Sequence, residues 1–160
     1  MWQELVKVLG KLADAYERLL ELARRKRAAL VAVDMEALER LIEEENGIID
    51  EIQHLEFGRQ QILGQLSREL PEFSEGATME DVARHSPDDI RPWIRQLHKR
   101  LDEAVSRTKE AGEANEFLIH SALSAVKYHL NRLGNSVVEP AYGGKGEEVV
   151  SRQKNFDFRA

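Results

Sequence analysis

Few side chains in this 160-residue sequence have the types and spacing that a chemical site requires. The best candidate is Glu51-Ile-Gln-His54, which has the Glu-x-x-His spacing of the carboxylate-bridged di-iron bundles. Those sites need two such motifs and two further inward-facing glutamates, and this chain has one copy of the motif. Glu51 and His54 also lie off the apolar stripe that Ile48, Ile52 and Leu55 define. We therefore interpret the pair as part of a solvated helix face and expect no bound metal.

The other residues that could take part in catalysis lack partners. His120 and His129 are not paired with any candidate nucleophile, and no Ser-His-Asp arrangement stands out. The chain has no cysteine, which removes thiol catalysis, disulfides and Cys-zinc sites and fits a reducing compartment. The Gly143-Gly-Lys-Gly146 segment lacks the strand and helix that a phosphate loop needs. We therefore expect that the protein is not an enzyme and binds no cofactor.

Charge and hydropathy narrow the class of partner. The net charge is −6, which argues against nucleic acid because a phosphate-tracking surface needs a basic face. The one strong basic cluster, Arg24-Arg25-Lys26-Arg27, lies where cations favour the C-terminal end of a helix dipole, although an acidic partner or a membrane surface is an alternative. No apolar run reaches the roughly 20 residues needed to span a bilayer, and the N-terminus lacks a signal-peptide pattern. We expect a cytosolic protein without stable membrane insertion.

Composition and periodicity predict long helices. Ala, Glu, Leu, Lys and Arg dominate, and aromatic residues make up only 6%. Apolar residues recur at alternating steps of three and four over about 2–31, with Lys26 as the one polar interruption. A similar stripe, which includes Glu45, covers about 35–70, with Asp34 as its N-cap and Pro71 after its end. The connection of about three residues predicts that these two helices form an antiparallel hairpin.

A third long helix is predicted from Ser86, as N-cap, to about Leu133, where Gly134-Asn135 end it. Before it, Thr78-Met-Glu-Asp81 has the form of a capping box and predicts a short helix over 78–84. At 1.5 Å per residue the three long helices span roughly 45, 50 and 70 Å. About a dozen residues of the third helix should therefore extend beyond the hairpin or pack on something else.

The sequence thus predicts an all-α protein: a long antiparallel helical hairpin plus a third long helix, in a coiled-coil-like three-helix bundle. We expect a bundle domain over 1–134 and a flexible C-terminal tail over 135–160. Thr108 and Asn115 fall at inward positions of the third helix, and a buried Asn at such a position commonly fixes register.

The far end of the third helix carries two apolar stripes. One consists of Leu118, Ala122 and Ala125, and the other of Ile119, Leu123, Val126, Leu130 and Leu133. A hairpin plus one helix covers one stripe of each helix, so the second stripe either closes an intramolecular core or forms a groove for a partner helix. The extra length of the helix favours the binding interpretation.

Three segments in order resemble the FlgN-type flagellar export chaperones. Residues 29–38, Ala-Leu-Val-Ala-Val-Asp-Met-Glu-Ala-Leu, resemble the junction between the first two helices of that family. Asn115-Glu-Phe-Leu118, followed by the apolar end of the third helix, resembles its N-x-x-L segment. Tyr142-Gly-Gly-Lys-Gly146 and Phe156-Asp-Phe-Arg-Ala160 resemble its tail. The resemblance covers almost the whole chain.

The resemblance implies a bacterial cytoplasmic chaperone of hook-associated proteins, which join the flagellar hook to the filament. Such a chaperone would bind the C-terminal amphipathic helix of its client, keep the client unassembled and deliver it to the type III export gate and export ATPase complex. The implied client groove consists of Leu118, Ile119, Ala122, Leu123, Val126 and Leu130, and Tyr142 is the implied gate-docking residue. The alternative is a structural coiled-coil protein of a secretion or flagellar apparatus that self-associates, and a homodimer is left open.

Overall fold

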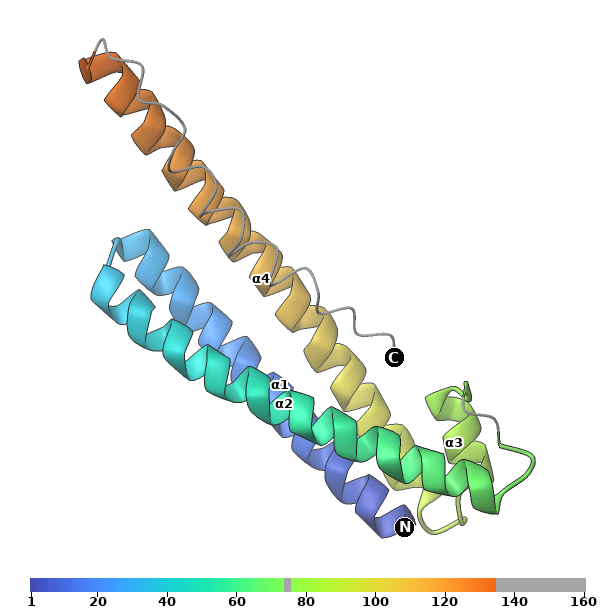
Figure 1. The fold of residues 1–160 in the computed structure, drawn as a ribbon. Helices are drawn as coiled ribbons and strands as arrows, with labels where there is room; N and C mark the ends of the chain where they lie inside the picture. Colours follow the sequence, from blue (N-terminus) through green and yellow to red (C-terminus); the bar gives the residue numbers. More distant parts are fainter. Residues whose placement is uncertain (74–75, 135–160) are drawn as a thin grey trace. The chain divides into compact units, whose positions relative to one another are not determined.

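A computed structural model describes residues 1–73 and 76–134, and the predicted tail over 135–160 lies outside the described residues. Its four helices are α1 (Trp2–Ala32), α2 (Met35–Glu69), α3 (Met79–His85) and α4 (Arg91–Gly134) (Figure 1). The described part of the chain contains no strand, so the predicted all-α class is confirmed. The chain divides into two compact units, residues 1–112 and residues 113–159, and α4 contributes to both.

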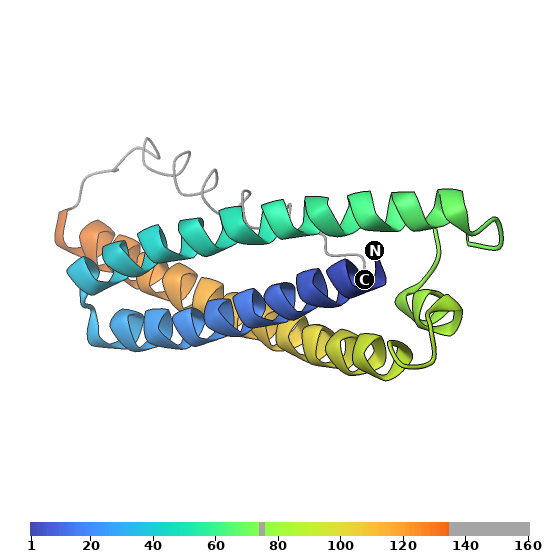
Figure 2. The same ribbon diagram turned by 90° about the horizontal axis from the view of Figure 1, so that it is seen from below.

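The helices α1 and α2 form the predicted antiparallel hairpin and lie side by side in both ribbon views (Figures 1 and 2). Their connection is a tight cap of two residues. The backbone N–H groups of Val33 and Asp34 donate to the carbonyls of Leu30 and Ala29, at 3.2 and 2.9 Å. Asp34 then caps α2, because its carboxylate accepts from the N–H of Ala37 at 3.1 Å. The predicted N-cap is therefore confirmed.

The same turn holds one backbone residue in an unfavourable region. Val33 has φ 54° and ψ 37°, the left-handed conformation, and is the one non-glycine residue with positive φ among residues 1–73 and 76–134. Glycine is the usual residue at this position after a helix because it has no Cβ to collide with the following carbonyl. A β-branched side chain makes the collision worse.

The core of the first unit is centred on α1. Leu5, Leu9, Leu12 and Ala15 are fully buried, and burial continues along the helix to Ala29. Both α2 and the first part of α4 pack on α1. Arg100 of α4 binds Asp14 and Glu17 at 2.7 and 2.6 Å, and its hydrogen bond lowers the pKa of Glu17. Further along, the hydroxyl oxygen of Thr108 lies 3.3 Å from the carbonyl oxygen of Tyr16, so α4 still contacts α1 there.

The polar residue that interrupts the apolar stripe of α1 has a buried partner. Lys26 Nζ lies 2.8 Å from the Glu45 carboxylate of α2, and the two side chains are only 8% and 14% exposed. Each charge therefore compensates the other in a place where an isolated charge would be costly. Outside the buried layer, Arg18–Glu51 at 2.6 Å and Arg25–Glu44 at 3.2 Å join the same two helices.

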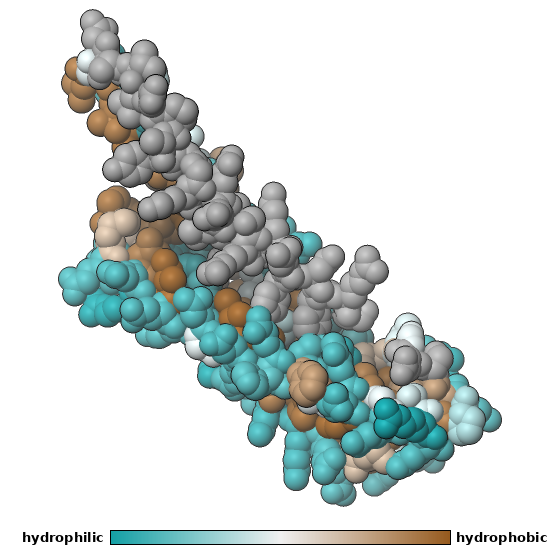
Figure 3. Space-filling view, viewed as in Figure 1, coloured by the Kyte–Doolittle hydropathy of each residue, from teal (hydrophilic) through white to brown (hydrophobic). Residues whose placement is uncertain are grey.

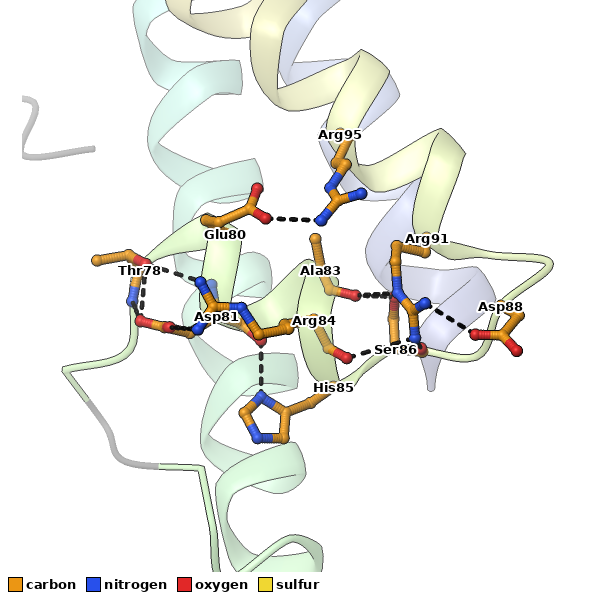
Figure 4. Close-up of polar contacts among 10 residues, drawn as sticks. All are labelled: Thr78, Glu80, Asp81, Ala83, Arg84, His85, Ser86, Asp88, Arg91 and Arg95. Carbon is orange, nitrogen blue, oxygen red and sulfur yellow. Dashed lines mark hydrogen bonds and ion pairs between the residues drawn. The ribbon is translucent and has the colours of Figure 1, made fainter.

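The short helix α3 is built from the predicted capping box. The Thr78 hydroxyl accepts from the Asp81 N–H at 3.2 Å, and the Asp81 carboxylate accepts from the Thr78 N–H at 3.0 Å (Figure 4). The Thr78 hydroxyl also donates to the Asp81 carboxylate at 2.7 Å, and this bond, together with the one from the Thr78 N–H, lowers the pKa of Asp81. An ion pair between Glu80 and Arg95, at 2.7 Å, links α3 to α4 and lowers the pKa of Glu80.

The predicted start of the third long helix was wrong. Ser86 is the C-cap of α3, and its hydroxyl donates to the Ala83 carbonyl at 2.6 Å instead of capping the following helix. The helix α4 begins at Arg91, whose guanidinium donates to the carbonyls of Ala83 and Ser86 at 3.1 and 2.9 Å (Figure 4). Pro92 has no N–H to donate toward the preceding turn, so the regular helix cannot extend back through it.

We predict that Val33→Gly raises the free energy of unfolding by about 1 kcal/mol, because glycine removes the Cβ strain of the left-handed conformation. Urea denaturation followed by circular dichroism measures the change. The matched control is Val31→Gly, two residues earlier in α1, which should lower stability by about 0.5 kcal/mol through lost helix propensity. Equal losses for the two variants would contradict the assigned turn.

Candidate partner-binding surface

The last part of α4 exposes an apolar stripe. Residues 121–134 are all exposed, although the segment carries five large apolar or aromatic side chains: Leu123, Val126, Tyr128, Leu130 and Leu133. Three of them, Leu123, Val126 and Leu130, expose 54–56% of their surface. Figure 3 shows hydrophobic atoms at this end of α4 and also near the turn between α1 and α2. Contiguous exposed apolar surface commonly marks a site that binds another molecule.

The six described residues of the predicted client groove fall on one side of α4. We call this set the client stripe: Leu118, Ile119, Ala122, Leu123, Val126 and Leu130. Its members from Ile119 onward are spaced three or four residues apart, or adjacent, as one face of an α-helix requires. Leu118 and Ile119 are half-buried, and the other four are exposed. Tyr142, the seventh predicted site residue, lies outside the described residues.

A second exposed feature was missed by the sequence analysis. Phe117 and Tyr128 are 72% and 61% exposed, and they lie eleven residues apart, or three helical turns, on one side of α4. At 100° per residue this side is roughly opposite the centre of the client stripe. Ser121 and Ser124 lie between the two aromatic residues. The signal was present in the sequence as a second, weaker spacing of four, three and four residues.

Charge is distributed unevenly along the same part of α4. Residues 110–116 carry Glu110, Glu113 and Glu116 and no Lys or Arg. Residues 117–134 carry Lys127, Arg132 and two histidines and no Asp or Glu. The helix therefore changes from acidic to basic along its length, and its basic end is the end where cations favour the helix dipole.

Polar residues at inward positions of α4 behave as their spacing predicted. Asn115 is buried, and Thr108 is half-buried with its hydroxyl donating to the Ala104 carbonyl at 2.7 Å. Thr108 and Asn115 therefore lie on the buried side of α4, before the exposed residues 121–134 begin.

The two residues of the Glu-x-x-His motif contact other protein groups and not each other. Glu51 is ion-paired with Arg18, and His54 lies 2.8 Å from the Asp50 carbonyl through Nδ1. Over residues 1–73 and 76–134, no group of three His, Asp or Glu side chains is arranged to hold a metal ion. The two residues line a shallow charged depression with Lys11 and Asp14, and this depression contains one apolar lining residue, Leu55.

A smaller apolar patch lies at the turn of the hairpin. Val31, Val33 and Met35 expose more than half of their surface there. Among the described helices, none is long and apolar enough to cross a bilayer.

The exposed apolar side chains of α4 are arranged as one face of an amphipathic helix. A second amphipathic helix can cover such a surface.

Comparison with known proteins identifies one family. A family model described as "FlgN protein" matches residues 1–149, which is most of the chain. No curated protein and no solved structure matches the chain.

We predict that Leu123→Ser combined with Val126→Ser changes the free energy of unfolding by less than about 0.5 kcal/mol, because both side chains are already exposed. Leu101→Ser, in the buried part of α4, should lower it by about 3 kcal/mol through the cavity and the buried hydroxyl. Urea denaturation of the three proteins makes the comparison. A large loss in the double variant would mean that the client stripe is part of a folded core.

Proposed function

The chain belongs to the FlgN family of flagellar export chaperones, and on that premise we propose that its client stripe binds the C-terminal amphipathic helix of a hook-associated flagellar protein. This family is one of chaperones and not of enzymes. The observation that carries the proposal is the exposure of Leu123, Val126 and Leu130 on one side of a helix whose buried side ends near Asn115.

The shape of the surface supports a helical client. From Ile119 to Leu130 the client stripe covers about 17 Å of helix, or three turns, at 1.5 Å per residue. A helix that lies in such a stripe inserts residues at positions i, i+3 or i+4, and i+7. The terminal helix of an unassembled client exposes the same kind of apolar face and would aggregate if nothing covered it.

The energetics suit a partner that must later be released. Burial of about 600 Å² of apolar surface contributes roughly 15 kcal/mol at 25 cal/mol per Å². Loss of rotational and translational freedom, together with ordering of both chains, offsets most of that gain. Because no residue of the client stripe is charged, the net affinity depends mainly on packing and not on strong ion pairs.

Delivery requires a second contact, with the export gate and the export ATPase complex in the bacterial cytoplasm. We assign the gate contact to Tyr142, which follows the client stripe in sequence and lies outside the described residues. Separate residues for client and gate would let the chaperone hold its cargo while it docks.

We predict that Leu123→Asp combined with Val126→Asp weakens binding of a peptide of the client's C-terminal helix by at least about a hundredfold, because two buried contacts become desolvated charges. Fluorescence anisotropy of labelled peptide with the full-length chain measures the affinity.

Two controls separate the possible explanations. Phe57→Asp introduces the same charge at an exposed apolar residue of α2 and should leave the peptide affinity within about twofold. Tyr142→Ala should also keep peptide affinity, while it lowers secretion of the client from cells. Unchanged peptide binding in the double Asp variant would refute the client stripe as the binding surface.

A further inference from the structure

The side of α4 that carries Phe117 and Tyr128 has the spacing of a helix-pairing surface. Its four residues, Phe117, Ser121, Ser124 and Tyr128, are separated by four, three and four positions, and all four are exposed. This is the a/d spacing of a coiled-coil seam. We call the set the aromatic-serine stripe. It lies roughly opposite the client stripe on the same helix, so a partner on one stripe leaves the other uncovered.

We propose that the aromatic-serine stripe pairs with the same stripe of a second copy of this chain, with the two α4 helices antiparallel. This inference does not depend on the identity of the client. A two-fold axis between positions 122 and 123 places Phe117 of each copy opposite Tyr128 of the other. The same axis places Ser121 opposite Ser124. An antiparallel seam has this pairing of a with d positions, so each residue of the stripe meets a suitable counterpart.

The chemistry of the two layers fits close helix packing. Small serine side chains at the centre let the two backbones approach, and their hydroxyls can hydrogen-bond to each other or to backbone carbonyls across the pair. At each end one phenylalanine meets one tyrosine, and such aromatic pairs contribute beyond the area that they bury. The tyrosine hydroxyl can remain at the solvent edge of the seam.

The charge distribution selects the second copy and its direction. Glu113 and Glu116 of one helix lie at the level of the basic part of residues 117–132 of the other only if the helices are antiparallel. A parallel pair would place Glu113 beside Glu113 and Arg132 beside Arg132. Charge complementarity between the two halves of one helix is what an isologous interface requires, because both partners present the same surface.

The pairing is short, so the dimer should be weak. The overlap of 113–132 on both helices covers about 30 Å and lies entirely within the second compact unit. Interfaces of that extent fall in the small class, whose members associate transiently. The dimer should therefore form and dissociate as concentration changes, and both client stripes remain accessible in it.

We predict that sedimentation velocity of the full-length chain shows a monomer–dimer equilibrium that moves toward dimer over about a hundredfold increase in concentration. Phe117→Glu should keep the chain monomeric throughout that range. Glu113→Lys with Glu116→Lys should weaken dimerisation about tenfold, and the addition of Lys127→Glu and Arg132→Glu should restore it, because the complementary halves are exchanged. Asp102→Lys with Glu103→Lys is the matched control, since it makes the same charge change outside the overlap and should leave dimerisation unchanged.

The register is tested by disulfide trapping, for which the cysteine-free chain is well suited. Equal amounts of Ser121→Cys and Ser124→Cys proteins, with one mass-tagged, should form the mixed disulfide under mild oxidation, because the two positions share a layer. A mixture of Ser106→Cys and Ser124→Cys proteins is the control, because Ser106 lies on the same side of α4 but in a different layer from Ser124. This mixture should give little mixed disulfide. A chain that stays monomeric at every concentration, a Phe117→Glu variant that dimerises normally, or equal cross-linking in the control mixture would each overturn the proposal.

Discussion

The fold depends on the burial of α1 by two neighbouring helices at once. Because α2 packs along one side and the first part of α4 along another, most apolar residues of α1 from Leu5 to Ala29 are buried and its exposed side is mostly polar. Leu5, Leu9 and Leu12 are fully buried at its start, and the Lys26–Glu45 pair maintains the contact with α2 further along. A charged pair inside an otherwise apolar layer disfavours a shifted hairpin, since any other register would leave one buried charge without its counterpart. The hairpin is therefore the support on which the first part of α4 packs.

Anchoring at one end explains how α4 can present apolar side chains at the other. Its first residues are held by α3, by the carbonyls that Arg91 contacts and by the ion pairs of Arg100 with α1. The helix then continues without interruption into the second compact unit, where residues 121–134 are exposed. An isolated amphipathic helix of this length would be marginal in water, and continuity with a packed segment removes the cost of nucleating it. The client stripe that we propose thus lies on an extension of a helix whose first part is packed.

Much of this arrangement could be predicted from the sequence, because local signals and periodicity determined it. The heptad spacing predicted α1 and α2, Asp34 predicted the start of α2, and Thr78 with Asp81 predicted α3. The start of α4 was misplaced because Ser86 resembles an N-cap, whereas the structure uses it to end α3 and leaves the start of α4 to Pro92 and the tertiary contacts of Arg91. Phe117 and Tyr128 were missed because they lie on the side of α4 that does not continue from its buried positions. Exposure on the opposite side cannot be read from spacing alone.

We propose that the client stripe of α4 is open in the free chain and is covered when a client helix binds. Hydrogen–deuterium exchange of the full-length chain, with and without a saturating client helix peptide, distinguishes the two states. We expect the peptide to slow exchange over residues 115–134 and to leave exchange in the buried part of α1 unchanged. Protection confined to the α1–α2 turn, or exchange over residues 115–134 that does not respond to the peptide, would contradict it.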